Sequence, residues 1–383
     1  MASKLIDICG YAKGKIAVAG LTDQTYISTE NMLPNKGGIT KATSLPSAES
    51  TQAYKKNDVL VSNIRPYFKK IWHAECDGGC SNDVLVFRAA EGVDPTYLYY
   101  VLADDNFFNY ATATSKGTKM PRGDKSAIME YCVPDFGIGV QRKIGSLLRS
   151  IDQRIVVNSK INDNLQEQAQ TLFAERFYLR NSDPIPEGWS LVSLGDVAVI
   201  SNKSFNPLKQ PETMLEHYSI PAFDEKRYPV FELSTEVKSN KFIVDSDCFM
   251  ISKLNPTTKR VWRPYCMTEN AVCSTEFIVY KAKVRELTDF LYSLIDSASF
   301  SDFMCSHVTG STGSRQRTTP SDTLQYQFYM PTADEIADFS AVVAPMYAQI
   351  RINAMENARL KGLRDSLLPR LMSGEIDVAD IDA

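Results

Sequence analysis

Two long stretches of the chain carry apolar residues at a seven-residue spacing, the pattern of a helix that pairs with another helix. The first stretch runs from Gln141 to Phe177. Its main row of positions is Ile144, Ile151, Asn158, Leu165 and Leu172, and its companion row is Leu148, Ile155, Asn162 and Ala169. The second stretch runs from Ala337 to Met372. It repeats both rows 195 positions later, at Phe339, Met346, Asn353, Leu360 and Leu367 and at Val343, Ile350, Asn357 and Arg364.

Asparagines interrupt the apolar rows at equivalent places in the two stretches. An Asn in a helix–helix seam lowers stability but fixes the register, because its amide needs a partner across the interface. We therefore predict that the two helices pair with each other as an antiparallel coiled coil. Each spans about 36 residues, or roughly 54 Å at 1.5 Å per residue, which suits a spacer. The alternative, a helix that only covers its own domain, requires no seven-residue repeat.

Outside these stretches, short apolar runs between turn residues predict strands. Val59–Val61 and Val84–Phe87 are such runs, and residues 34–38 read as a loop. A helix is predicted after Asp94-Pro95, where apolar residues fall on one face. Residues 189–334 repeat this plan, with a helix expected near Leu287–Phe300. Each globular part is thus predicted to be mixed α and β, and the whole chain to be of the α+β class.

The second half of the chain repeats the first at an offset of about 190 residues. The block Cys80–Phe87 returns as Cys273–Tyr280, and Arg65-Pro66 meets Asn255-Pro256. A repeat of this length indicates a duplicated domain and not a solenoid. One chain then carries two similar surfaces with approximate two-fold symmetry, an arrangement that suits duplex DNA with two half-sites.

The repeat and the helical stretches divide the chain into six segments. We predict a first recognition domain at 1–136, a spacer helix at 137–178, a linker at 179–188, a second recognition domain at 189–334, a second spacer helix at 335–374 and an acidic tail at 375–383. Gly374 is expected at the position that follows the C-cap of the second helix.

Composition describes an ordinary soluble chain, with 44% apolar and 23% charged residues. No run approaches the ~20 apolar residues of a membrane span, and the N-terminus does not read as a signal peptide, so a cytoplasmic location is expected. Lys and Arg number 42 against 46 Asp and Glu, a formal net charge of −4. This balance makes tight DNA binding by the chain alone less expected, although local basic clusters remain possible because screening acts over ~8–10 Å.

No motif for catalysis or metal binding survives inspection. The sequence lacks a Walker A loop and a Gly-x-Gly-x-x-Gly loop, and Asp135-Phe136-Gly137 lacks the other kinase motifs. His73, Cys76 and Cys80 resemble a zinc site, but the repeat replaces His73 by Arg263 while it keeps cysteines at Cys266 and Cys273. Zinc needs four ligands together, so buried thiols are the preferred interpretation and no metal is predicted. A binding role is favoured over an active site.

Basic and amide residues gather in loops that recur in both halves, and these are the candidate DNA contacts. In the first half they are Asn63, Arg65, Tyr67, Lys69, Lys70, Lys116, Lys119, Arg122 and Lys125. In the second half they are Lys253, Asn255, Lys259, Arg260, Arg263, Ser314, Arg315, Gln316 and Arg317. Arg and Gln can form bidentate pairs with guanine and adenine edges, whereas many single lysines are only solvated surface charges. Similar loops with different side chains suit the reading of two unlike half-sites.

With these features the chain resembles the specificity subunits of type I restriction–modification systems over nearly its whole length. The resemblance rests on Gly188-Trp189 followed by Ser193–Asp196, on Asn57–Leu60, on the helix that contains Gln141–Ile144 and Asp152–Ile155, and on the ending Leu363–Ile376. The ending is the most specific of these marks. The first domain departs from the pattern because it lacks the Gly-Trp opening.

The resemblance implies a non-catalytic subunit in which each recognition domain reads one half of a split DNA site. It implies that the paired helices set the spacing and dock two methyltransferase (M) subunits, which restriction (R) subunits join. S-adenosylmethionine, ATP and Mg²⁺ would then be cofactors of the partner subunits, with none in this chain. Leu147, Ile161, Val342 and Leu363 become candidates for contact with a partner helix, or else pack under the adjacent domain. A stand-alone methyltransferase or nuclease and a protein–protein scaffold are the alternatives.

Overall fold

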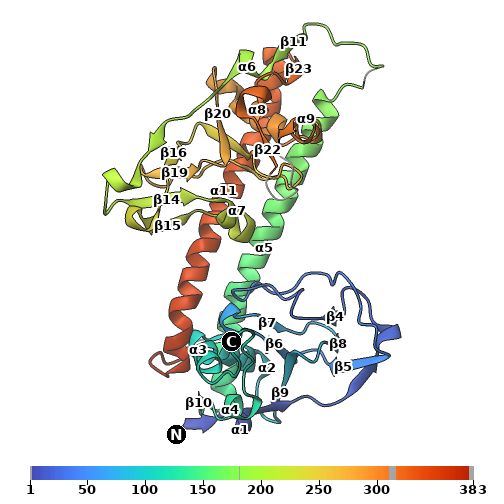
Figure 1. Ribbon diagram of the computed structural model, residues 1–383, viewed down its shortest axis with the longest axis vertical. Coiled ribbons are helices and arrows are strands. Elements are labelled where there is room, and N and C mark those ends of the chain that lie inside the picture. Colours follow the sequence, from blue (N-terminus) through green and yellow to red (C-terminus); the bar gives the residue numbers. More distant parts are fainter. Residues whose placement is uncertain (1, 181, 310–315, 379–383) are drawn as a thin grey trace. The chain divides into compact units, whose positions relative to one another are not determined.

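The computed structural model describes residues 2–180, 182–309 and 316–378 (Figure 1). The chain forms two compact units: unit 1 is Met1–Ile155 with Leu360–Ala383, and unit 2 is Val156–Arg359. Each unit contains one α+β fold and a segment of each of two long helices, α5 (Ile138–Phe177) and α11 (Ala333–Met372). Within the described ranges, no helix combines the length and the apolar character that a membrane crossing requires.

The described part of unit 1 is built on two four-stranded sheets and one strand pair. The first sheet has the order β2 (Cys9–Tyr11), β9 (Val84–Ala89), β6 (Val59–Ser62), β7 (Ile71–His73), and the second has the order β3 (Lys15–Ala17), β5 (Ser50–Tyr54), β8 (Gly78–Cys80), β4 (Tyr26–Ile27). Strand β1 (Ala2–Lys4) pairs with β10 (Cys132–Pro134). The helices are α1 (Leu5–Ile8), α2 (Pro95–Ala103), α3 (Asp105–Ala113) and α4 (Lys125–Met129), with 3₁₀ turns η1 (Val18–Gly20) and η2 (Pro66–Phe68).

The described part of unit 2 repeats this plan. Its first sheet has the order β12 (Ala198–Ile200), β20 (Phe277–Ala282), β17 (Cys248–Ser252), β18 (Val261–Trp262), and its second has the order β13 (Ser204–Phe205), β16 (Lys241–Ile243), β19 (Ala271–Ser274), β14 (Met214–Tyr218), β15 (Val230–Leu233). The strand pairs are β11 (Ser190–Ser193) with β23 (Gln327–Met330) and β21 (Val308–Thr309) with β22 (Arg317–Thr318). The helices are α6 (Leu194–Val197), α7 (Ile220–Lys226), α8 (Thr288–Ile295), α9 (Ala298–Ser306) and α10 (Pro320–Thr323), with 3₁₀ turns η3 (Pro207–Lys209), η4 (Ser234–Glu236) and η5 (Arg285–Leu287).

The predicted repeat and the mixed α+β class are confirmed by this matching strand order. In each unit the central strand of the first sheet, β6 or β17, is buried along its whole length. That burial explains why the sequence of these strands is a continuous apolar run and not an alternating one. The second sheet of each unit also contains one parallel pair, β4 with β8 and β14 with β19.

The prediction of one helix near Leu287–Phe300 is wrong, because the structure has two helices there, α8 and α9. Ser297 adopts extended backbone angles, and its hydroxyl accepts a hydrogen bond from the backbone N–H of Phe300 at 3.2 Å. A residue that caps a new helix in this way ends the preceding one. Asp104 separates α2 from α3 in the same manner, since its carboxylate accepts from the N–H of Asn106 at 2.9 Å.

In unit 2, segments of α5 and α11 pair in opposite directions through the predicted asparagines. The Asn158 amide donates to Oδ1 of Asn357 at 3.0 Å, and the Asn353 amide donates to Oδ1 of Asn162 at 2.9 Å. Asn158, Asn353 and Asn357 are buried, so each amide meets its partner away from water. The prediction that the two helices pair with each other, with these amides in register, is confirmed.

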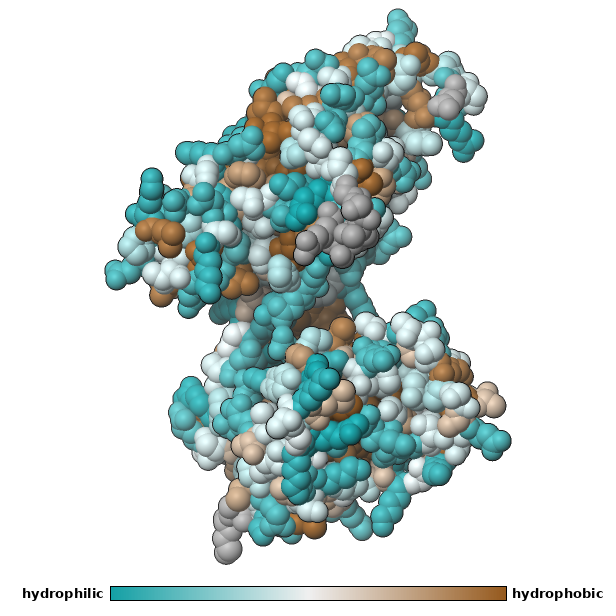
Figure 2. Space-filling view, in the orientation of Figure 1, coloured by the Kyte–Doolittle hydropathy of each residue, from teal (hydrophilic) through white to brown (hydrophobic). Residues whose placement is uncertain are grey.

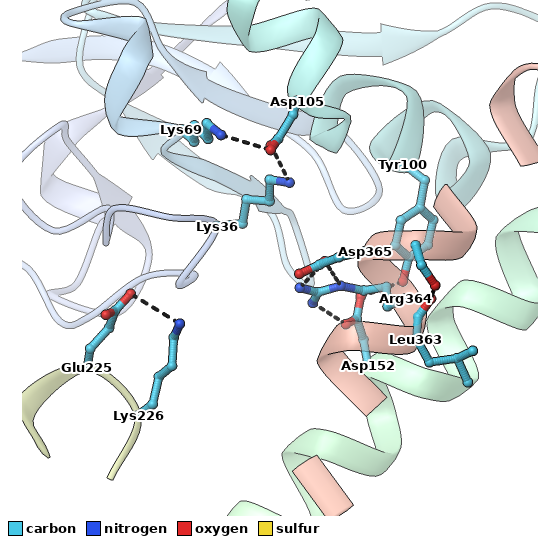
Figure 3. A network of polar contacts seen from close by, with 11 residues as sticks. Lys36, Lys69, Tyr100, Asp105, Asp152, Glu225, Lys226, Leu363, Arg364 and Asp365 are labelled. Atoms are coloured by element: carbon cyan, nitrogen blue, oxygen red, sulfur yellow. Dashed lines mark hydrogen bonds and ion pairs between the residues drawn. The ribbon is translucent and has the colours of Figure 1, made fainter. Parts of the chain in front are cut away.

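In unit 1, the other segments of α5 and α11 meet through apolar side chains and one charged network. Ile144 and Leu148 share a core with Leu368 and Leu371. Arg364, at a predicted seam position, donates to the Asp152 carboxylate at 2.7 Å, and the same carboxylate accepts from the Tyr100 hydroxyl at 2.7 Å (Figure 3). Burial acts to lower the pKa of Arg364, but the Asp152 charge outweighs it and the pKa is raised.

The core of each unit includes the helix ends that pack against its sheets. In unit 2, Ala169, Phe173, Phe339 and Val343 belong to one buried cluster with α8 and β20. Phe173 lies outside the seven-residue frame, yet it is buried and contacts Phe290 and Phe339 with ring centroids 5.5 and 5.8 Å away. A helix that faces both a partner helix and a sheet needs a wider apolar stripe than a two-stranded seam does. Predicted seam positions that are half-buried are Ile155, Leu165, Leu172, Met346, Ile350, Leu360 and Leu367; Ile151 is buried.

The C-terminal end of α11 agrees with the sequence-based interpretation, whereas only two of the four cysteines interpreted as buried thiols are buried. Gly374 has φ +74° and follows the last residues of α11, as a C′ glycine does. Cys80 and Cys273 are buried in β8 and β19, whereas Cys76 and Cys266 are half-buried. Burial raises the pKa of Cys80 to about 12, so this thiol stays protonated. In the residues that the structure describes, no group of three or more His, Cys, Asp or Glu side chains is placed to hold a metal ion.

Candidate nucleic-acid interface

In unit 1 the turn that follows β6 is held against a short hairpin, and together they contain the predicted first-half contacts. The hairpin closes where Lys116 and Arg122 exchange backbone hydrogen bonds of 2.8 and 2.9 Å. The N–H of Arg65 donates to the carbonyl of Pro121 at 2.8 Å, and the N–H of Gly123 donates to the carbonyl of Asn63 at 3.1 Å. Two loops that lie about 50 residues apart in sequence thus form one surface, which we call the unit 1 loop pair (residues 62–70 and 116–125).

Unit 2 contains the same arrangement after β17. The N–H of Asn255 donates to the carbonyl of Gln316 at 2.9 Å, and the N–H of Thr318 donates to the carbonyl of Lys253 at 3.1 Å. Thr309 and Arg317 pair across β21 and β22 as Lys116 and Arg122 do in unit 1. The unit 2 loop pair comprises residues 252–263 and the described residues 308–309 and 316–318. Ser314 and Arg315 lie outside the described residues.

An arginine of each hairpin ties its loop pair to the neighbouring sheet through a carboxylate. Arg122 pairs with Asp83 at 3.1 Å, and Arg317 pairs with Glu276 at 2.9 Å. The two carboxylates precede β9 and β20 at equivalent positions, and their backbone carbonyls accept from the N–H of Asn63 and of Lys253. The hydrogen bond with Glu276 raises the pKa of Arg317. These arginines therefore position the loops.

Carboxylates also neutralise five of the ten other predicted basic contacts that the structure describes. In unit 1, Asp105 lies between Lys36 and Lys69, at 2.8 and 2.9 Å from their ammonium groups (Figure 3), and Lys116 pairs with Asp124. Burial would raise the pKa of Asp105, but the hydrogen bonds and charges of the two lysines lower it. In unit 2, the pairs are Lys259 with Asp296 at 2.8 Å, Arg260 with Asp224 at 2.6 Å, and Arg263 with Asp289.

A few of the predicted side chains remain exposed at the loops. Tyr67 is 48% exposed and lies against Phe68 with ring centroids 4.8 Å apart. Lys119 and Lys125 are exposed and form no ion pair with a described residue. Lys70 instead donates to the carbonyl of Thr29 at 2.6 Å, and burial lowers its pKa. Among the described residues, each loop surface therefore combines basic groups that are paired with carboxylates and basic groups that are not. Figure 2 shows separate hydrophobic clusters on a mainly hydrophilic surface.

Sequence reasoning found the basic loop residues but missed the carboxylates that hold them. Asp83 and Glu276 are detectable, because they stand at equivalent places in the repeated Cys80–Phe87 and Cys273–Tyr280 blocks. Asp105 and Asp296 are harder to find, since they approach Lys69 and Lys259 only when the helices fold back on the turns. Such anchors could be found in the sequence by looking for acidic residues that occupy equivalent places in both halves, as the basic loop residues do.

Known proteins with related sequences share one description. No family model matches the chain. The type I restriction enzyme MjaIX specificity subunit of Methanocaldococcus jannaschii is 23% identical over 318 residues, which covers 76% of this chain and 71% of that protein. The type I restriction enzyme HindI specificity subunit of Haemophilus influenzae is 23% identical over 436 residues. That match covers 92% of this chain and 94% of that protein.

A solved structure supports the same assignment at the level of the fold. The type I restriction–modification S subunit from M. genitalium superposes with a TM-score of 0.60 at 14% identity, and the match covers 97% of this chain and 96% of that one. The chain has the fold of a type I S subunit. Its curated homologues are type I restriction enzyme specificity subunits, as the sequence resemblance predicted.

Proposed function

We propose that this chain is the non-catalytic DNA-specificity subunit of a type I restriction–modification complex, and that each unit reads one half of a bipartite DNA site. The observation that carries the proposal is the recurrence of one loop pair in both units. Both pairs have the same backbone hydrogen bonds and the same Arg–carboxylate anchor, although their other side chains differ. A shared scaffold with different side chains is what two unlike half-sites require.

The neutralised cations fit this role because the anchoring pairs hold the loops while a few exposed groups meet the phosphates. Lys119, Lys125 and Tyr67 are such groups in unit 1. A net charge of −4 and so many internal ion pairs predict weak affinity of the isolated chain for DNA. Tight binding then requires partner subunits that add their own phosphate contacts.

The helices α5 and α11 are proposed to set the spacing of the half-sites and to dock two M subunits. Exposed apolar side chains on these helices support the docking, because apolar groups gathered on a protein surface are typical of sites that bind another protein. Of the four candidates from the sequence, Ile161, Val342 and Leu363 are 41%, 38% and 45% exposed, whereas Leu147 packs against the core of unit 1. In unit 2, Val156, Val157, Ile352 and Met355 add exposures of 49%, 48%, 56% and 37%.

Methyl transfer and DNA cleavage belong, in this proposal, to the M and R subunits of a cytoplasmic complex. S-adenosylmethionine, ATP and Mg²⁺ would bind those subunits. The search of the sequence for catalytic motifs supports this division of labour, because the chain carries no recognisable nucleotide or methyl-donor loop.

The test is selection of bound duplexes from a random DNA library by the chain co-purified with its M subunit, at several salt concentrations. We expect a motif of two short fixed halves around an unread spacer, and affinity that falls steeply with salt. A single continuous motif would contradict the assignment of one half-site to each unit. Absent or salt-insensitive binding would favour a protein scaffold, and methylation or cleavage by the chain alone would establish an enzyme.

A further inference from the structure

The turns that follow β6 and β17 share a non-glycine residue in the left-handed region at an equivalent point, directly before a proline. Arg65 has φ +50° and Asn255 has φ +48°. Each precedes a proline, and each donates its backbone N–H to the hairpin of its own loop pair. The two side chains therefore extend from equivalent positions in the two turns, which are 190 residues apart in the chain.

The conformation of these two residues is unfavourable for any side chain with a Cβ atom. Glycine adopts left-handed angles freely and is the default residue at such a position, and Asn tolerates them better than Arg does. Strained backbone of this kind persists where the surrounding structure imposes it, and it concentrates at functional positions. The retention of a side chain in both copies indicates that the side chain itself is needed.

Both side chains also hold a polar atom that the described part of the protein leaves without a hydrogen bond. The buried Nε of Arg65 and the buried Oδ1 of Asn255 have no partner among the described residues, and the same is true of Oδ1 of Asn63 beside Arg65. Arg65 differs from Lys69, Arg122 and Arg260 in that no described carboxylate pairs with it. Buried polar atoms are almost always satisfied, so a ligand that supplies hydrogen bonds here has a physical basis.

We infer that Arg65 and Asn255 are the matched specificity positions of the two units, and that each reads one base. An arginine fork fits O6 and N7 of guanine, whereas an asparagine amide fits N6 and N7 of adenine. Unit 1 then requires a guanine at one position of its half-site, and unit 2 requires an adenine at one position of the other. This inference rests on the proposed function, and it assigns the neighbouring ion-paired residues to the positioning of the loops.

The inference is tested by mapping methylated bases in the DNA of cells that express the chain with its M subunit. Arg65→Gly removes the side chain and suits the left-handed backbone, so the fold should survive. We expect it to make one guanine of one half-site degenerate, with the preference for guanine lowered roughly 5- to 150-fold. Arg65→Asn should replace that guanine by adenine. Asn255→Gly and Asn255→Arg should act in the same way on the other half-site only.

Arg227→Gly is the matched control, because Arg227 also has a left-handed backbone (φ +47°) but lies at the end of α7, outside both loop pairs. It should leave the motif unchanged. An unchanged motif in Arg65→Gly, or changes in both half-sites, would overturn the inference. If a variant shows no methylation, its purified complex is titrated with duplexes that differ only at the candidate base, and equal affinity loss for all of them also overturns it. A wild-type motif without two halves would instead refute the proposed function.

Discussion

At the scale of single residues, His73 shows how burial can make the stability of this chain depend on pH. His73 ends β7, and its ring lies against Tyr99 with ring centroids 5.5 Å apart. Its Nε2 is buried and has no hydrogen-bond partner in the described part of the chain. Burial first, and then the positive charge of Arg149, lower the pKa of His73 below its ordinary value of about 6.5.

The neutral form of His73 is therefore the one that the folded state favours. In the unfolded chain its pKa returns to about 6.5, so below that pH the unfolded state binds more protons than the folded state does. The contribution of His73 to stability is present above pH ~6.5 and is lost as the pH falls toward the folded pKa. We expect His73→Gln to reduce the drop in the free energy of unfolding between pH 7.5 and 5.5, as measured by urea titration.

Gln153→Ala serves as the control for this prediction, because Gln153 is exposed and carries no titratable group. It should leave the pH dependence as it is in the wild type. Because other groups titrate in the same range, the comparison uses the difference between the two pH values for each variant and not the absolute stability. An identical drop in wild type and His73→Gln would show that the buried ring does not titrate differently on unfolding.

Single residues also show which features of the loops the sequence predicts and which it does not. Arg65, Lys69 and Arg122 were identifiable as loop residues, because their loops recur in both halves. Their charge partners were not, since an ion pair such as Lys69 with Asp105 depends on how α3 folds back against the turn. The left-handed backbone angles of Arg65 and Asn255 were not predictable either, because a glycine indicates that conformation in a sequence, whereas Arg and Asn do not.

At the scale of elements, the asparagine pairs of α5 and α11 give a direct measure of how the helices recognise each other. Asn158→Ala leaves the buried Oδ1 of Asn357 without its donor, and we expect this change to destabilise the chain by about 1–3 kcal/mol. We expect Asn357→Ala to destabilise it by less, because the Asn158 amide still donates to Glu356 at 2.8 Å. The double variant should destabilise less than the sum, with a coupling of roughly 0.5–3 kcal/mol in a urea-unfolding double-mutant cycle.

Gln153→Ala is the matched control on the same helix, because Gln153 is exposed. It should change the free energy of unfolding by about 0.5 kcal/mol or less. Additive effects of Asn158→Ala and Asn357→Ala would mean that the hydrogen bond at 3.0 Å does not contribute to the pairing.

Helix prediction from the sequence succeeded in the middle of α5 and α11 and weakened toward their ends. Around Asn158 and Asn162 each helix faces one partner, so the seven-residue frame selects the contacts correctly. Near Phe173 and Leu371 the helices face sheets and neighbouring helices as well, and the buried positions leave that frame. The break at Ser297 was missed for a related reason: a serine in an apolar run becomes a cap only through its local backbone angles.

At the scale of the whole molecule, the proposed spacing role of the helices predicts a change in the DNA site when both helices are shortened together. The paired segments 159–165 of α5 and 350–356 of α11 contain the Asn162–Asn353 pair, and their removal leaves the Asn158–Asn357 pair intact. Each helix becomes about 10.5 Å shorter at 1.5 Å per residue. At 3.4 Å per base pair, we expect the unread spacer of the methylated motif to shorten by about three base pairs.

The half-sites themselves should remain the same, because neither loop pair is altered. Deleting only residues 159–165 is the informative control: it removes Asn162 and leaves Asn353 without its partner, so the pairing should weaken and methylation should fall. A double deletion that methylates the original motif with an unchanged spacer would contradict the role of the helices in spacing. It would leave the assignment of one half-site to each loop pair standing, since that assignment depends on the turns after β6 and β17 and not on helix length.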